Sequence, residues 1–418
     1  MHHLHNLFTL ILFGLIITGF TGRPDKDIIE KANEIHKEVL TLDSHTDTPL
    51  MLDRDDFDIG KKNDPLQGGG QVDYPRMQEG GLDAAFFAVF IGQGERNDEA
   101  NLRVKERAFH IFDLIHKSIE KHPGTAGLAL TPDDAYRLRD NGRLAIYIGL
   151  ENGYPIGRDL SLIDKYHDLG ARYITLCHTR NNDICDSSTD PEGPEHGGLS
   201  DFGREVVSRM NKTGMMIDVS HISDDAFYDV IEISNTPVIA SHSNARAICD
   251  NPRNFDDDML LALKKNGGVI QVCILSAYVK TPAPDPERDA AVKEVRERYN
   301  NFTGLTDHEM EEAREAWDDV NKKHPRKLAS VADLVNHIDH IVNLIGIEHV
   351  GIGTDFDGGG SLYDCSDASE IGNITLELVR RGYSKSDIEK IWAGNFMRVF
   401  REVEAKKEPV AVSLMRNN

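Results

Sequence analysis

Eight short apolar runs alternate with helix-period sequence along the chain, and this alternation limits the possible folds more than any other feature. Most of the runs do not alternate polar with apolar residues, as expected of parallel strands buried on both faces. The order predicts an α/β fold, a (β/α)8 TIM-like barrel, with a doubly wound sheet as the alternative. The predicted strands are Val39–Asp43, Leu82–Ile91, Leu144–Leu150, Tyr173–Leu176, Met215–Val219, Val238–Ala240, Val269–Leu275 and Val350–Gly353.

One crossover of the predicted barrel is much longer than the others. After Tyr278 the chain becomes charged and proline-rich, and then helical over Glu287–Tyr299 and Asp307–Lys322. We expect a helical insertion at about residues 279–326, between strands 7 and 8. It would be a solvated surface feature, a lid over the barrel mouth or a contact between the subunits of a homodimer. Although 418 residues often form several domains, barrels of this size form one, so we expect a single domain over residues 23–418.

The last predicted helix is Lys385–Val403. Ser386 and Glu389 have the spacing of a capping box. An apolar stripe on this helix predicts a core face rather than a ligand site, and it comprises Ile388, Ile391, Trp392, Phe396 and Val399.

The N-terminal sequence predicts export. Residues Leu7–Phe20 form a 14-residue apolar run followed by Thr21 and Gly22. This run is too short to span a bilayer and is typical of a signal peptide, which we assign to residues 1–22. We therefore expect a periplasmic or secreted protein. The sequence Val410–Asn418 has no hydrophobic tail of the kind that directs a GPI anchor.

Charge and cysteine content exclude several classes of function. The formal net charge of −23 would repel nucleic acid and anionic lipid. Cys177 and Cys273 lie in apolar runs and are expected to be buried, whereas the other three cysteines lie in predicted loops. This odd number leaves room for one disulfide and at least one free thiol. The absence of a CxxC motif argues against a cysteine-based zinc site.

Acidic and imidazole side chains stand where the predicted strands end. His45 and Asp47 occupy alternate positions on a strand, which point to the same face. A lone His-x-Asp is more often a hydrogen-bonded histidine beside a turn aspartate. However, six of the eight strands end in such residues, and barrel enzymes carry their catalytic groups there. The other five are Glu151, His178, His221, His242 and Asp355.

Three histidines and two carboxylates suit Zn²⁺, with Mn²⁺ or Co²⁺ as alternatives. Five ligands exceed the three protein ligands of a one-zinc catalytic site. A carboxylate can bridge two ions, so we predict that His45, Asp47 and Glu151 hold one ion. Glu151, His221 and His242 would hold the other.

Two metal ions about 3.5–4 Å apart share a water, acidify it to a hydroxide and polarise a carbonyl. Two site residues then remain for the chemistry. Asp355 would act as general base and acid on that water. His178 would donate a hydrogen bond to the oxyanion.

Together these motifs resemble the membrane (renal-type) dipeptidase family, the zinc dipeptidases of the amidohydrolase-like barrels. The resemblance spans roughly residues 40 to 400. It is carried by Asp43–Asp47 (DSHTD), Gly149–Gly153 (GLENG), Leu176–Asn182 (LCHTRNN), Asp218–His221 (DVSH), Ser241–Arg246 (SHSNAR), Arg253–Asn254, Gly353–Gly358 (GTDFDG) and Gly394–Arg398 (GNFMR).

The resemblance implies hydrolysis of dipeptides, with tolerance of a D-residue at the C-terminal position. It implies zinc ligands at the five positions already named, and Asp355 as the acid/base. His178 and Arg253 match the family's substrate-binding residues, and Tyr278 falls where the family has a substrate-contacting tyrosine. A buried guanidinium would bind the free carboxylate of a dipeptide through two parallel hydrogen bonds.

The chain departs from the family's animal members in its missing GPI signal, its cysteine pattern and its longer insertion after Tyr278. Two other functions stay open from the sequence. One is a different amide or ester hydrolase, such as a lactamase or an acyl-amino-acid hydrolase. The other is a catalytically inactive binding protein, against which the retention of a full set of site residues argues.

Overall fold

The computed structural model describes residues 23–65, 68–300, 307–325 and 327–408. The predicted signal peptide and the segment Val410–Asn418 lie outside the described residues. Among the residues described, no helix combines the length and the apolar composition that a membrane crossing requires.

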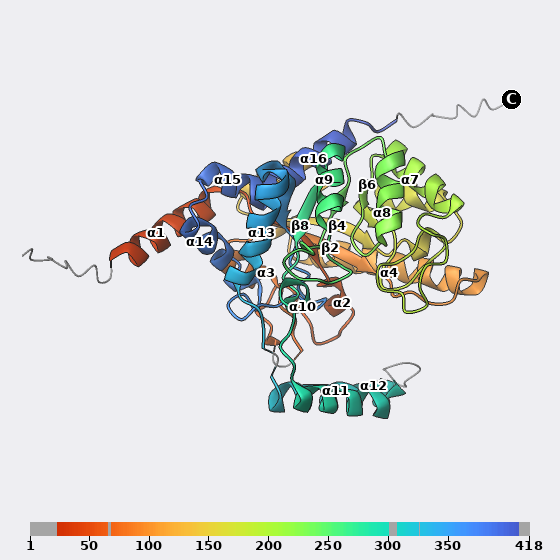
Figure 1. The fold of residues 1–418 in the computed structure, drawn as a ribbon, viewed down its shortest axis with the longest axis horizontal. Coiled ribbons are helices and arrows are strands. Elements are labelled where there is room, and N and C mark those ends of the chain that lie inside the picture. Colours follow the sequence, from red (N-terminus) through yellow and green to blue (C-terminus); the bar gives the residue numbers. More distant parts are fainter. Residues whose placement is uncertain (1–22, 66–67, 301–306, 326, 409–418) are drawn as a thin grey trace, which may run out of the picture.

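The described chain forms a nearly closed barrel of eight parallel strands surrounded by helices (Figure 1). The barrel order is β1-β2-β4-β5-β6-β7-β8-β9. Between the first and last strands the backbone N–H of Asp47 donates to the Phe356 carbonyl, and that of Asp355 donates to the His45 carbonyl. The barrel prediction is confirmed, and the doubly wound alternative is wrong. The strands are β1 (Leu42–Thr46), β2 (Ala84–Phe90), β3 (Ala126–Leu128), β4 (Leu144–Glu151), β5 (Ala171–Thr175), β6 (Met216–Asp218), β7 (Ile239–Ala240), β8 (Val269–Val272) and β9 (Val350–Ile352).

The predicted strands correspond to β1, β2 and β4 to β9, with ends that differ from the prediction by up to three residues. Strand β1 begins three residues later than expected, so His45 lies within it and Asp47 follows it directly. Strand β3 was not predicted. Its three residues pair only with β4, outside the barrel path, and are too few to give a periodic signal.

Most of the helices surround the barrel, while α11 and α12 lie away from it (Figure 1). The helices are α1 (Arg23–Glu38), α2 (Pro49–Leu52), α3 (Tyr74–Gly80), α4 (Asp98–Lys121), α5 (Pro132–Asp140), α6 (Ser161–Asp168), α7 (Asp201–Thr213), α8 (Asp224–Ile233), α9 (Asp257–Asn266), α10 (Ser276–Val279), α11 (Pro286–Arg298), α12 (Asp307–Lys323), α13 (Val331–Ile345), α14 (Gly372–Arg380), α15 (Lys385–Glu389) and α16 (Asn395–Glu404).

The barrel interior forms a core of its own at the end where the strands begin. Phe86, Tyr147 and Tyr173 stack inside it, with ring centroids 4.7 Å apart for Phe86–Tyr147 and 5.2 Å for Phe86–Tyr173. Phe396 and Phe400 of α16 pack on the same cluster. Helix α16 therefore closes this end of the barrel, and only the opposite end, where the strands finish, is left for a site.

The last predicted helix begins at Lys385 as expected, but its capping box differs from the prediction and it is not one continuous α-helix. The residues of the predicted apolar stripe are buried, as expected of a core face. The capping box is formed by Ser384 and Asp387, not by Ser386 and Glu389, because α15 begins at Lys385 and leaves Ser386 inside its first turn. A π-helical segment, Lys390–Gly394, joins α15 to α16.

The predicted insertion contains two helices, α11 and α12, that project from the barrel (Figure 1). They pack on each other around a small cluster of their own, Val295, Tyr299, Ala313 and Val320. Arg288 joins them by donating to Asn321 Oδ1 at 2.8 Å. A role for this pair as a lid or as a dimer contact stays a prediction.

All five cysteines are among the described residues, and all are buried free thiols. Cys185, Cys249 and Cys365 were expected in loops, where one disulfide had room to form. The structure contains no disulfide among them.

His337 of α13 links the outer helices to the loops around the barrel mouth. Its Nδ1 accepts from the Ala245 backbone N–H at 3.1 Å, and its Nε2 donates to the Val279 carbonyl at 2.8 Å. Burial lowers the pKa of this imidazole to about 4. The folded protein therefore holds His337 neutral at a pH where the unfolded chain binds a proton.

We expect His337 to make stability fall as the pH drops from about 6.5 to about 4. Above this window neither state binds the proton, and below it both do. Over the whole window the free energy of unfolding would fall by about 3 kcal/mol. Unfolding free energies at several pH values would measure it. In His337→Gln, which cannot titrate, the loss should be smaller by that amount, and an unchanged pH profile would contradict the assignment.

Candidate metal centre

The residues predicted to form the site converge at the carboxyl ends of the strands. His45 lies in β1 and Glu151 is the last residue of β4. The other predicted ligands and acid/base residue come one to three residues after a strand ends, and they are Asp47, His221, His242 and Asp355. His178, which follows β5, joins them. All seven lie close together because the strand ends and the turns that follow them meet at one end of the barrel.

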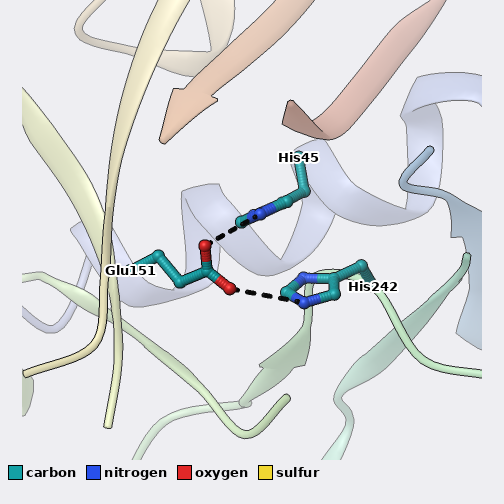
Figure 2. Close-up of side chains that lie close together, drawn as sticks. All are labelled: His45, Glu151 and His242. Carbon is teal, nitrogen blue, oxygen red and sulfur yellow. Dashed lines mark ion pairs between the residues drawn. The ribbon is translucent and has the colours of Figure 1, made fainter. Parts of the chain in front are cut away.

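Glu151 lies close to four imidazoles of the group, and Figure 2 shows it between His45 and His242. Its Oε2 is 3.4 Å from His45 Nε2, and its Oε1 is 3.6 Å from His242 Nε2. The same Oε1 lies 3.1 Å from His221 Nε2 and 3.7 Å from His178 Nε2. One carboxylate thus has imidazoles at both of its oxygens, as a bridging ligand requires.

Several buried atoms of this group have no hydrogen-bond partner. They include Asp47 Oδ1 and His45 Nε2, and the latter lies 3.4 Å from Glu151 Oε2. The Nε2 atoms of His221 and His242 are only 2.8 Å apart. Buried polar atoms without partners are rare in proteins, and imidazoles and carboxylates are ligands that zinc binds in proteins. These residues therefore fit a divalent metal ion.

Ligand atoms within 4.8 Å of one another form three overlapping groups. Two of them share Glu151, and two share His45. The groups are His45–Glu151–His242, Glu151–His178–His221 and His45–Asp47–Asp355. His178 and Asp355 thus lie as near to the centre as the predicted ligands do.

The imidazoles of His221 and His242 are held neutral. Burial lowers the pKa of each well below its ordinary value, and nearby positive charges lower it further. Burial alone would raise the pKa of Glu151, but the surrounding imidazoles outweigh it and hold that pKa well below its ordinary value. Neutral imidazole and ionised carboxylate are the forms that bind metal.

Asp355 is placed by an unusual backbone. Its φ of 62° lies in the left-handed region, which aspartate tolerates better than most residues. A Cβ at Gly358 would come within 2.0 Å of Asp47 Oδ2 and 2.3 Å of Asp355 Oδ1, so only glycine fits there. Burial and the neighbouring Asp47 raise the pKa of Asp355 well above its ordinary value.

Arg253 lies buried beside the imidazole ligands. Its Nη2 donates to the His242 carbonyl at 3.1 Å, while its Nε has no partner. The Tyr278 ring lies against the guanidinium, 5.4 Å from Cζ to the ring centroid. The structure thus brings Arg253 and Tyr278 together at the edge of the cluster.

The imidazole of His178 is neutral. Burial lowers its pKa, which leaves an N–H that the ring can donate.

Sequence reasoning missed the residues behind the ligands. His242 Nδ1 lies 2.8 Å from Ser241 Oγ, which donates to Asp218 Oδ2 at 2.6 Å. His45 Nδ1 lies 2.8 Å from the Tyr173 hydroxyl. Asp218 and Ser241 stand within recognised motifs, so they could have been suspected. Tyr173 is an interior residue of β5, and no sequence pattern marks it.

Comparison with known proteins identifies the family. The model of the membrane dipeptidase family, peptidase family M19, matches residues 29–413. The chain belongs to this family. Dipeptidase tcpJ of Claviceps purpurea is 32% identical over 369 residues, which cover 87% of this chain and 76% of the relative. Dipeptidase 3 of Rattus norvegicus is 31% identical over 390 residues, covering 92% and 69%.

Solved structures support the same assignment. The probable dipeptidase PvdM from Pseudomonas aeruginosa superposes with a TM-score of 0.78 at 32% identity, covering 91% of this chain and 99% of that one. A metallo peptidase from Rhodobacter sphaeroides, solved with a phosphinate mimic of the dipeptide L-Ala-D-Ala, shares the fold at 21% identity. Its TM-score is 0.70, and the match covers 87% of this chain and 99% of that one. The predicted enzyme class, a metallo-dipeptidase of this family, is confirmed.

Proposed function

We propose that this protein is a binuclear zinc dipeptidase that cleaves free dipeptides and tolerates a D-residue at the C-terminal position. The observation that carries the proposal is a buried carboxylate, Glu151, with imidazoles at both oxygens and a buried arginine nearby. Three ligands would suffice for one catalytic ion, and the cluster offers more. The mimic of L-Ala-D-Ala bound by the Rhodobacter sphaeroides relative motivates the choice of an L-D substrate.

His45, Asp47, Glu151, His221 and His242 would hold the ions. Bound zinc supplies a water acidified towards hydroxide near neutral pH and polarisation of the scissile carbonyl. Both effects act at the carboxyl end of the barrel, where the ligands meet.

The remaining residues bind substrate and move protons. Arg253 would bind the C-terminal carboxylate, with the Tyr278 ring held against its guanidinium. His178 would donate its N–H to the carbonyl oxygen as negative charge develops there. Asp355 would take a proton from the attacking water on one carboxylate oxygen and deliver it to the nitrogen of the leaving amine.

The role of Arg253 predicts a preference for free dipeptides over their amides. Hydrogen bonds to charged groups contribute about 1.5–3 kcal/mol each. Arg253→Lys keeps the charge but loses the planar fork, so KM for a dipeptide should rise roughly 10- to 150-fold. Steady-state kinetics on a dipeptide, its C-terminal amide and a tripeptide would measure both the preference and the change in KM. The wild type should cleave the amide poorly and the tripeptide hardly at all.

Arg76 offers a matched control. It is 5% exposed, against 3% for Arg253, but it already pairs with Asp73 and Asp367. Arg76→Lys should leave the KM values unchanged. If the wild type cleaved the free acid and the amide at equal rates, Arg253 would not bind the substrate carboxylate.

A further inference from the structure

The three imidazoles predicted to bind metal differ in what holds their second nitrogen. His242 Nδ1 has a serine hydroxyl backed by an aspartate, as described above. His221 Nδ1 is buried without a partner. His45 Nδ1 lies 2.8 Å from the hydroxyl of Tyr173, a residue to which neither the sequence nor the family motifs gave a role.

If His45 binds an ion, each hydrogen bond around its ring has a defined donor and acceptor. Its Nε2 faces Glu151 and Asp47 and needs a free lone pair to bind an ion. The ring proton must then be on Nδ1, which donates to Tyr173 Oη. The Tyr173 hydroxyl in turn donates to the Ser44 carbonyl at 3.2 Å. Each donor has one acceptor, and the chain of bonds returns to the strand that carries His45.

The barrel interior is shaped around the Tyr173 ring. The side chain is completely buried and packs against Phe86. A Cβ on Gly149 would lie 2.1 Å from Tyr173 Cζ and 2.5 Å from its hydroxyl, so the neighbouring strand has room for this ring only because it carries glycine there.

We propose that Tyr173 is a positioning residue for metal binding, because its hydroxyl holds His45 in the tautomer that leaves Nε2 free for the ion. A partner of this kind orients the imidazole without adding a charge, and its loss typically weakens metal binding 10- to 100-fold. The inference rests on the proposed function, since it assumes that His45 binds an ion.

The test compares two tyrosine-to-phenylalanine variants from one aromatic cluster. Tyr147 is equally buried and stacks on the same Phe86, but its hydroxyl donates to the Thr131 carbonyl, away from the site. Chelator-stripped protein would be titrated with Zn²⁺ in competition with a chromophoric chelator. Tyr173→Phe should bind one of two ions about 10- to 100-fold more weakly than wild type, and Tyr147→Phe should bind both normally.

Equal zinc affinities in wild type and Tyr173→Phe would overturn the inference, as would an equal loss in Tyr147→Phe. Absence of zinc binding in the wild type would instead contradict the proposed function. If Tyr173→Phe did not fold, the wild type still decides the question. Nitrogen-15 NMR of its histidines should show His45 protonated at Nδ1, and protonation at Nε2 in the zinc-loaded protein would overturn the inference.

Discussion

Asp355→Asn should lower kcat by about 10²- to 10⁴-fold and leave the zinc content near that of wild type. The carboxylate stands 7% exposed in the cluster, beside Asp47, and asparagine keeps its shape and tolerates its backbone φ of 62°. The amide cannot accept the proton of the attacking water. Expulsion of an amine from a tetrahedral intermediate needs that proton, so the loss should fall on kcat rather than on KM.

A control for this variant lies two residues further on. Asp357 has nearly the same backbone, with φ of 66°, but its carboxylate accepts from the Thr48 hydroxyl and the Gln71 backbone N–H. Asp357→Asn should therefore retain most of the activity. Loss of zinc in proportion to activity in Asp355→Asn would make Asp355 a ligand, and near-full activity would move the proton transfer to another group, with His178 next.

Glu151→Gln should have the largest effect on metal content. The variant replaces a carboxylate that faces four imidazoles by a neutral amide, and it weakens both predicted ion sites at once. Metal ions contribute several kcal/mol of transition-state stabilisation. Loss of bound zinc should therefore lower kcat/KM about 10³-fold or more. Elemental analysis together with kinetics would measure both effects.

His178→Ala is the informative comparison for Glu151→Gln. His178 lies close enough to Glu151 and His221 to bind a metal ion with them. We nevertheless propose that it donates a hydrogen bond to the oxyanion. Its removal should lower kcat while both zinc ions stay bound. Loss of one zinc from His178→Ala would make it a ligand, and full zinc content in Glu151→Gln would contradict the bridging role.

The barrel could be predicted because each strand is a continuous apolar run between polar turns. The strand ends were less certain, since hydrogen bonding rather than hydrophobicity decides where a strand stops. Strand β1 therefore starts later than its apolar approach suggested. The capping box was misplaced although the start of the helix at Lys385 was predicted correctly. The pattern of serine and an acid three residues later occurs twice in succession, and only the helix start distinguishes Ser384 from Ser386.

The site residues could be named because their chemistry and their place after strands coincide. The contacts behind them could not be named. Tyr173 of β5 contacts His45 of β1 although β2 and β4 lie between these strands in the sheet, and Gly149 of β4 leaves room for the ring. Such a contact depends on closure of the barrel and on the small size of Gly149. Neither can be recognised from a periodic pattern in the sequence.

The central claim is that two zinc ions in this cluster hydrolyse a dipeptide, and a stoichiometric titration tests it most directly. Chelator-stripped protein would receive zero to three equivalents of Zn²⁺ per chain, and the initial rate on an L-L and an L-D dipeptide would be followed at each point. We predict little hydrolysis without metal, a rise that ends at two equivalents, and cleavage of both substrates. Saturation at one equivalent, or no hydrolysis of any dipeptide with two zinc ions bound, would contradict the account.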